Sequence, residues 1–158
     1  MKKSRILNKA LNTAIADMGH LDVLIVCDAG LPIPRPEQRI DLAIEADKPG
    51  IVEILDLIMS DFIHERIIVA EEQKLYNPEH FKRVSALSDR CQVETMPHAQ
   101  LIAEFPAKAR YIVRTGAREP WGNVVLVSGI DAPEWFKKPG CIVPDYYESR
   151  ANYEDRKG

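Results

Sequence analysis

Cysteine is scarce in this chain, which has three among its 158 residues. Cys27, Cys91 and Cys141 form neither a CxxC pair nor a zinc-binding spacing, and an odd number suits a reducing compartment. We expect all three to be small buried hydrophobic side chains. No apolar run approaches the roughly 18 residues of a membrane span. Asn8 and Lys9 interrupt any signal-peptide core behind the basic N-terminus, so we expect a cytoplasmic protein.

Excess charge is also lacking. The formal net charge is -3 and the isoelectric point about 5.8, with lysine and arginine scattered along the chain. This balance argues against a nucleic acid or an anionic membrane as the main partner. With 46% hydrophobic and 28% charged residues, the chain fits one globular domain. It also lacks a glycine-rich phosphate loop, a GxSxG elbow and an HExxH helix, which argues against the commonest nucleotide-binding, hydrolase and zinc classes.

Helical and strand patterns alternate along the chain, which predicts an α/β domain with a mainly parallel sheet. The run Val23–Cys27 is continuous and β-branched, typical of a strand buried on both faces, and it ends at Asp28. Asp47 precedes Pro49 and predicts the cap of an amphipathic helix. We expect helices over 6–18, 51–59, 78–87 and 97–104, and strands over 23–27, 67–70, 92–95, 110–114 and 124–127. Gly19 is the expected C-cap glycine of the first helix.

Two proline-bearing stretches interrupt this pattern. Residues 29–36 carry prolines at every second position and predict a stiff loop after the first strand. From about Asp131, prolines alternate with aromatic residues and the chain ends in a charged tail. We therefore divide the chain into a domain over 1–130 and an irregular extension over 131–158, which we expect to lie over the domain or a neighbouring subunit.

Few residues are candidates for chemistry. Asp28 follows the first strand, at the edge where α/β sheets bind ligands, although a carboxylate there often only caps a turn. His20 follows the first helix, where a cation at the negative helix end is the plainer interpretation. His98 opens a helix after Pro97, where a neutral ring can accept or donate a proton.

The other candidates are less pointed. We expect His64 and His80 to be solvated on helix faces, and the adjacent pair Glu71-Glu72 to form no shared-proton dyad. Trp121, in Pro120-Trp121-Gly122-Asn123 before the last strand, is equally a core residue or a stacking platform. Two histidines, a carboxylate, an aromatic ring and an amide suit recognition of a polyhydroxylated ligand and proton transfer.

Two segments carry a family resemblance: Met18-Gly19-His20 and the run from Val26 to Pro34. With them the chain closely resembles the D-ribose pyranase family (RbsD-like), whose sister group is the L-fucose mutarotases (FucU-like). Further matches are Arg39-Ile40-Asp41, Ala70-Glu71-Glu72 with Lys74, Asn77-Pro78, His98, Arg114-Thr115-Gly116 and Asn123. The resemblance covers roughly residues 2 to 130.

The resemblance implies an isomerase that converts a free sugar between pyranose and furanose rings, or between anomers, without cofactor or metal. It also implies a three-layer α/β/α fold and self-association into rings, often decamers. By matching positions, His20 is the implied proton donor, Asp28 and His98 are sugar-binding residues, and Trp121, Gly122 and Asn123 are the remaining sugar contact.

The chain departs from the family at three of these positions. Trp121 stands where the family usually has tyrosine, Gly122 is more like the fucose branch, and Ala117 replaces a common glutamate. These departures keep the reaction class and leave ribose, fucose or another sugar open. A non-catalytic sugar-binding module associated with uptake is the alternative, and a ring-forming structural protein with a decayed site is a third.

Strand geometry predicts where the candidates lie. His20 and Asp28 flank one strand, which should separate them by roughly 15–25 Å at about 3.3 Å per residue. Asp28 and His98 follow strands, whereas His20 and the segment Trp121–Asn123 precede them. If all strands run parallel, we expect a site shared between subunits, with Asp28 and His98 from one and His20 or Trp121 with Asn123 from its neighbour.

Overall fold

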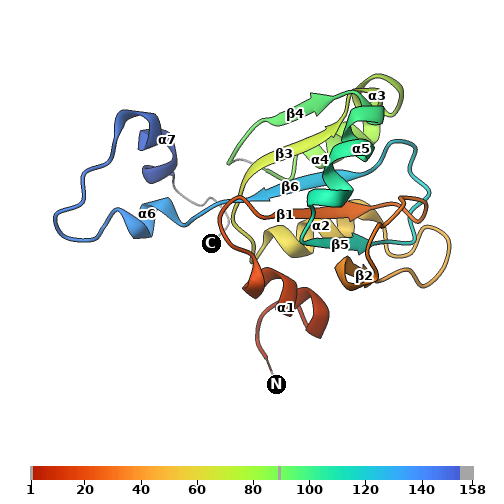
Figure 1. Ribbon diagram of the computed structural model, residues 1–158, viewed down its shortest axis with the longest axis horizontal. Helices are drawn as coiled ribbons and strands as arrows, with labels where there is room; N and C mark the ends of the chain where they lie inside the picture. Colours follow the sequence, from red (N-terminus) through yellow and green to blue (C-terminus); the bar gives the residue numbers. More distant parts are fainter. Residues whose placement is uncertain (1, 89, 154–158) are drawn as a thin grey trace.

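The computed structural model describes residues 2–88 and 90–153 as a sheet covered by helices on both faces, with a C-terminal extension beside it (Figure 1). The strands are β1 (Val23–Cys27), β2 (Arg39–Asp41), β3 (His64–Ala70), β4 (Val93–Met96), β5 (Tyr111–Arg114) and β6 (Val124–Ser128). The α-helices are α1 (Lys9–Asp17), α2 (Ile51–Met59), α3 (Glu71–Tyr76), α4 (Pro78–Ser85), α5 (His98–Lys108), α6 (Ala132–Trp135) and α7 (Glu148–Ala151). Two 3-10 turns cover Pro36–Gln38 and Asp145–Tyr147.

The strand order in the sheet is β2-β5-β1-β6-β3-β4. Pairs β2–β5, β5–β1 and β3–β4 are parallel, whereas β6 runs antiparallel to both β1 and β3. The mainly parallel α/β fold is therefore confirmed. The assumption that the last strand also runs parallel is wrong.

Each face of the sheet has its own core, which gives the expected three layers. Alternate residues of β1 point to opposite faces: Leu24 and Val26 join one core, and Ile25 and Cys27 the other. Helices α1, α2 and α4 cover the first core, and α5 covers the second. The domain thus buries both faces of β1, as its continuous apolar run predicts.

Most predicted elements exist with shifted ends. The first helix is shorter than predicted, and Gly19 lies beyond its C-cap, Met18. The helix at 51–59 has Gly50 as its N-cap, so the prediction for Asp47 is wrong: Asp47 instead pairs with Arg118. The fifth helix runs on to Lys108 through Pro106. Strand β2 and helix α3 were not predicted, since both are too short to show a period.

The cysteines differ from one another. Cys27 is fully buried, and this burial raises the pKa of its thiol to about 12. Cys91 is half-buried and Cys141 is exposed, so the expectation of three buried side chains is wrong for Cys141.

The extension is partly helical, because α6, the second 3-10 turn and α7 fold within it. It continues from the end of β6 and stands to the left of the sheet in Figure 1. The final charged residues of the expected extension, 154–158, lie outside the described residues.

Candidate functional site

One cluster of predicted residues lies at the edge where β1 ends and β6 begins, to the right in Figure 1. Asp28, His98 and Trp121 line a hollow of about 620 Å³ there. Its remaining walls are Ala29, Gly30, Ala117, Arg118, Glu119 and Pro120. Antiparallel β6 causes this meeting, because its start lies beside the end of β1.

Asp28 both caps a turn and lines the hollow. Its Oδ1 accepts hydrogen bonds from the backbone N–H groups of Gly30 (2.8 Å) and Leu31 (2.9 Å), so the carboxylate does cap a turn. Its own N–H donates to Asn123 Oδ1 at 3.0 Å, across the β1–β6 edge. Oδ2 takes no hydrogen bond from the described part of the chain and is the oxygen left for a ligand.

His98 is the first residue of α5 and lines the same hollow. Its backbone N–H donates to Glu72 Oε2 at 2.9 Å, so a carboxylate from α3 satisfies a free N–H at the helix start. Glu72 therefore positions the start of α5 at His98. The expectation that Glu71 and Glu72 form no shared-proton dyad stays a prediction.

Trp121 is half-buried, with φ at 53°, a conformation that is rare for a large side chain. Its ring centroid lies 5.5 Å from that of Tyr76, at an angle of 42°. Its carbonyl accepts a hydrogen bond from the buried Gln73 side chain at 2.7 Å. Trp121 is therefore an aromatic wall of the hollow and stands outside both buried cores.

The atoms around Gly122 leave no room for a Cβ atom at this position. A Cβ at this position would lie 2.6 Å from Glu119 Cβ and 3.0 Å from Ile51 Cδ1. Its N–H donates to the Glu119 carbonyl (3.0 Å), and its carbonyl accepts from His80 Nε2 (3.2 Å). Both backbone polar groups are thus occupied within the fold, which gives Gly122 a role in shaping the turn. Direct sugar contact by Gly122 stays a prediction.

Sequence reasoning missed the buried position of His80 beside this edge. Its side chain is 1% exposed, so the expectation of a solvated ring is wrong. Nδ1 lies 3.1 Å from Glu119 Oε2, and burial lowers the pKa of His80 although the Glu119 carboxylate opposes this shift. Through Nε2, His80 holds the Gly122 end of the Glu119–Gly122 turn, which carries Trp121. The same expectation is wrong for His64, which starts β3, is buried, and bonds Ser88 Oγ at 2.8 Å.

His20 lies at the opposite edge of the sheet. The next residue, Leu21, donates its N–H to the carbonyl of Ser128 at the end of β6 (2.9 Å), so β1 and β6 separate His20 from Asp28 and Asn123. His20 Nε2 lies 3.0 Å from Glu65 Oε2, and its side chain is 39% exposed. Glu65 is thus the side-chain partner of His20 in the fold, and the plainer interpretation of His20 as a cation at the helix end stays a prediction.

The predicted residues therefore form two half-sites: Asp28, His98, Trp121 and Asn123 at one edge, and His20 at the other. The prediction that Trp121 and Asn123 belong with His20 is wrong, because β6 is reversed. The prediction that the first strand separates His20 from Asp28 holds, because β1 lies between them.

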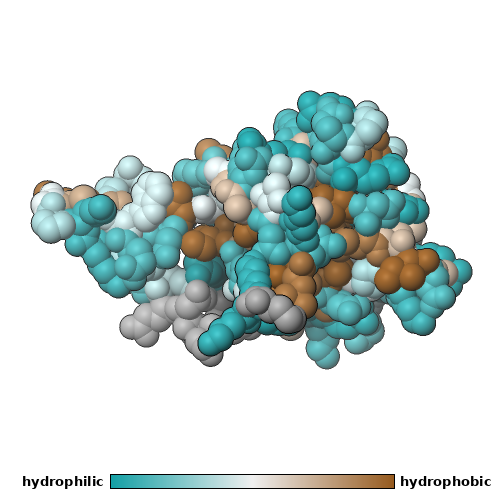
Figure 2. Space-filling view, turned by 90° about the horizontal axis from the view of Figure 1, so that it is seen from below, coloured by the Kyte–Doolittle hydropathy of each residue, from teal (hydrophilic) through white to brown (hydrophobic). Residues whose placement is uncertain are grey.

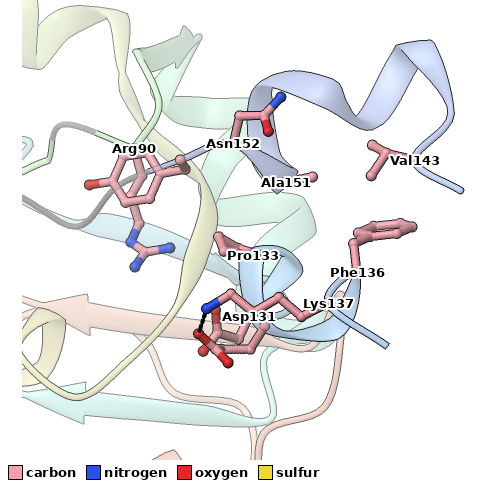
Figure 3. Close-up of a pocket in the computed structure, with 10 residues that line it drawn as sticks. Arg90, Asp131, Pro133, Phe136, Lys137, Val143, Ala151 and Asn152 are labelled. Carbon is pink, nitrogen blue, oxygen red and sulfur yellow. Dashed lines mark hydrogen bonds and ion pairs between the residues drawn. The ribbon is translucent and has the colours of Figure 1, made fainter. Parts of the chain in front are cut away.

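Another hollow, of about 800 Å³, lies elsewhere, between the extension and Arg90. Figure 3 shows Phe136 and Val143 across it from Arg90. None of the predicted site residues lines it. Within residues 2–88 and 90–153, no group of three or more His, Cys, Asp or Glu side chains is placed to hold a metal ion. No helix of that part is long and apolar enough to cross a membrane.

Comparison with known proteins adds sequence relatives. Residues 1–131 match the RbsD / FucU transport protein family. D-ribose pyranase 2 of Rubrobacter xylanophilus is 45% identical over 151 residues, which cover 96% of this chain and 98% of that protein. D-ribose pyranase 1 of Streptomyces griseus is 41% identical over 150 residues, covering 95% and 99%.

Two solved structures are similar to this chain in fold. The structure of Bacillus subtilis RbsD complexed with D-ribose superimposes with a TM-score of 0.77 at 32% identity, covering 82% of this chain and 98% of that one. The fucose mutarotase of Streptococcus pneumoniae, solved with L-fucose, has a TM-score of 0.61 at 19% identity and shares the fold.

Proposed function

Because the chain belongs to the RbsD/FucU family, we propose that it is a D-ribose pyranase, an isomerase that interconverts pyranose and furanose forms of a free aldose. The observation that carries this proposal is the 45% identity to D-ribose pyranase 2 over 96% of the chain. Bacillus subtilis RbsD, solved with D-ribose, supports a monosaccharide as the ligand.

The reaction needs two proton transfers. Opening a cyclic hemiacetal removes the proton of the anomeric hydroxyl and protonates the ring oxygen, and closing through another hydroxyl gives the other ring size. Histidine exchanges protons near neutrality, and positioned acid–base help accelerates such steps roughly 10²–10⁴-fold. We assign the proton donor to His20, whose exposed ring is held at Nε2 by Glu65.

The sugar-binding groups are assigned to the other half-site. Asp28 Oδ2 can accept hydrogen bonds from sugar hydroxyls, and His98 faces the same hollow. Asn123 uses Oδ1 on Asp28, which leaves its Nδ2 as a donor. Trp121 offers an aromatic face to the apolar side of a sugar ring.

These assignments require more than one copy of the chain. A single sugar ring is only a few ångströms across, whereas five residues of β1 at about 3.3 Å each separate the half-sites by roughly 16 Å. We therefore propose that the His20 edge of one copy meets the Asp28 edge of another in a ring, for which the family suggests a decamer, in the cytoplasm.

Exposed apolar side chains beside both half-sites support this assembly. Leu21, next to His20, is 60% exposed. Tyr76, whose ring lies beside that of Trp121, is 67% exposed, and the preceding residue, Leu75, is 65% exposed. Figure 2 shows apolar residues (brown) reaching the surface between polar ones on one face of the molecule. Side chains of this kind are typical of interfaces between subunits.

Saturation-transfer NMR between the ring forms of ribose tests the function, with wild type and His20→Ala at equal concentration. We expect wild type to accelerate the exchange and the variant to lose about 10²-fold or more. If neither protein accelerates the exchange, the alternative, a sugar-binding module, is favoured. The separation of His20 from the sugar-binding residues within one chain is also compatible with that alternative. Equal acceleration by both would remove His20 from the mechanism.

A further inference from the structure

Glu65 is placed beside His20 by an irregularity in β3. The register between β3 and β6 shifts between His64 and Arg66, so Glu65 leaves the regular ladder and its side chain is re-aimed. Gly129 makes room for it, because a Cβ at Gly129 would lie 3.3 Å from Glu65 Cβ. The Glu65 side chain is only 9% exposed.

One oxygen of the Glu65 carboxylate contacts two basic side chains. Glu65 Oε2 lies 3.0 Å from His20 Nε2 and 3.1 Å from Arg150 Nη1. A largely buried carboxylate is costly unless it is paired, and the guanidinium of arginine stays charged at all working pH values. Arg150 therefore keeps Glu65 paired whether His20 carries a proton or not.

Arg150 comes from the C-terminal extension, as part of α7. Its guanidinium lies 5.1 Å from the centroid of the Tyr147 ring, which packs in turn on Phe136 with centroids 5.6 Å apart. The Tyr153 ring lies under Arg90 at 4.4 Å. The extension thus holds Arg150 over the β3 irregularity through aromatic contacts of its own.

We propose that Arg150 and Glu65 are positioning residues for His20, so that the extension completes the proton-transferring half-site. The proposal rests on the proposed function for the role of His20. Glu65 fixes the ring through Nε2. Arg150 offsets the Glu65 charge, so that His20 can release its proton without leaving an unpaired carboxylate behind. Without Arg150, the uncompensated charge of Glu65 would attract the positively charged ring more strongly, and the transfer of its other N–H proton to the sugar would slow.

The test compares Arg150→Met, Arg150→Lys and Glu65→Gln with Lys137→Met, a control that removes one positive charge from the same extension at an exposed pair with Glu134. We expect Arg150→Met and Glu65→Gln to lower kcat for ribose ring exchange about tenfold with KM within about twofold, because the sugar-binding edge is untouched. Arg150→Lys should recover most of kcat, and Lys137→Met should match wild type.

A second readout does not depend on activity. The imidazole ¹H–¹⁵N signals of His20, assigned with His20→Ala, should move in Arg150→Met and Glu65→Gln and stay in place in Lys137→Met. Unchanged kcat and unmoved signals in Arg150→Met would overturn the proposal. So would an equal loss in Lys137→Met, since the extension would then act only by its docking. If wild type itself fails to accelerate exchange, the proposed function falls, and the His20 signals alone decide whether Arg150 positions the ring.

Discussion

Replacing His80 tests how a buried titratable ring supports the sugar-binding edge. His80→Ala removes the donor to the Gly122 carbonyl and leaves a cavity beneath the Glu119–Gly122 turn. An unpaired buried carbonyl costs about 1–3 kcal/mol and the cavity adds to this, so we expect a loss of about 2–4 kcal/mol of unfolding free energy. That is a large share of the roughly 5–15 kcal/mol of a typical domain.

His80→Gln separates the hydrogen bond from the titration. A glutamine amide can still donate to the Gly122 carbonyl, but it takes up no proton. Because burial lowers the pKa of His80 below 6.5, the unfolded chain binds the proton first as the pH falls. The stability contributed by the neutral ring is complete above 6.5 and is lost as the pH falls through the lowered pKa. The advantage of wild type over His80→Gln should therefore shrink with falling pH.

Urea unfolding of wild type, His80→Gln and His80→Ala at several pH values between about 8 and 5 measures these differences. An advantage of wild type that grows as the pH falls would refute the reasoning, because it would mean that His80 is stabilised as an imidazolium by Glu119. A His80→Ala variant as stable as wild type at all pH values would show that the turn does not depend on the ring.

Three further outcomes are expected. Trp121→Tyr should keep the fold and change the ranking of exchange rates on ribose, fucose and galactose, because a phenol hydroxyl replaces the indole N–H at the hollow; an unchanged ranking would mean that Trp121 does not set specificity. Gly122→Ala should lose about 1–3 kcal/mol in urea unfolding, because its Cβ would lie 2.6 Å from Glu119 Cβ, and unaltered stability would show that the turn relaxes freely. Iodoacetamide at about pH 8 should alkylate exposed Cys141 and spare Cys27, whose burial raises its pKa to about 12; mass spectrometry of the native protein would detect any modified Cys27 and contradict this.

The elements that the sequence predicts well are those whose own residues determine burial. Val23–Cys27 is apolar at every position, and the structure buries all five residues between two helical layers. Arg39–Asp41 could not be recognised in the same way, since a three-residue edge strand with two exposed charged residues has no pattern to read.

Residues whose surroundings come from distant segments were harder to predict. His80 lies among charged neighbours on α4, and both nitrogens of its buried ring face the turn at Glu119–Gly122, about 40 positions away. The direction of β6 is also determined by distant segments. The apolar run at 124–128 gives no sign of direction by itself, so the arrangement of the whole sheet decides that β6 runs antiparallel to β1. That reversal explains why Asp28, His98 and His20 were placed correctly relative to the strands while Trp121 and Asn123 were assigned to the wrong edge.

The central position of β6 has a consequence for how the chain is made. Before β6 is synthesised, β2, β5 and β1 can form one parallel piece and β3 with β4 another, each with an open inner edge. Open edges of this kind are templates for pairing with other chains, and contacts between distant segments form slowly. The inner edges, at β1 and β3, therefore stay open until Val124–Ser128 emerges and pairs with both. Substitutions that weaken β6 should harm the yield of folded protein during synthesis more than they harm the finished domain.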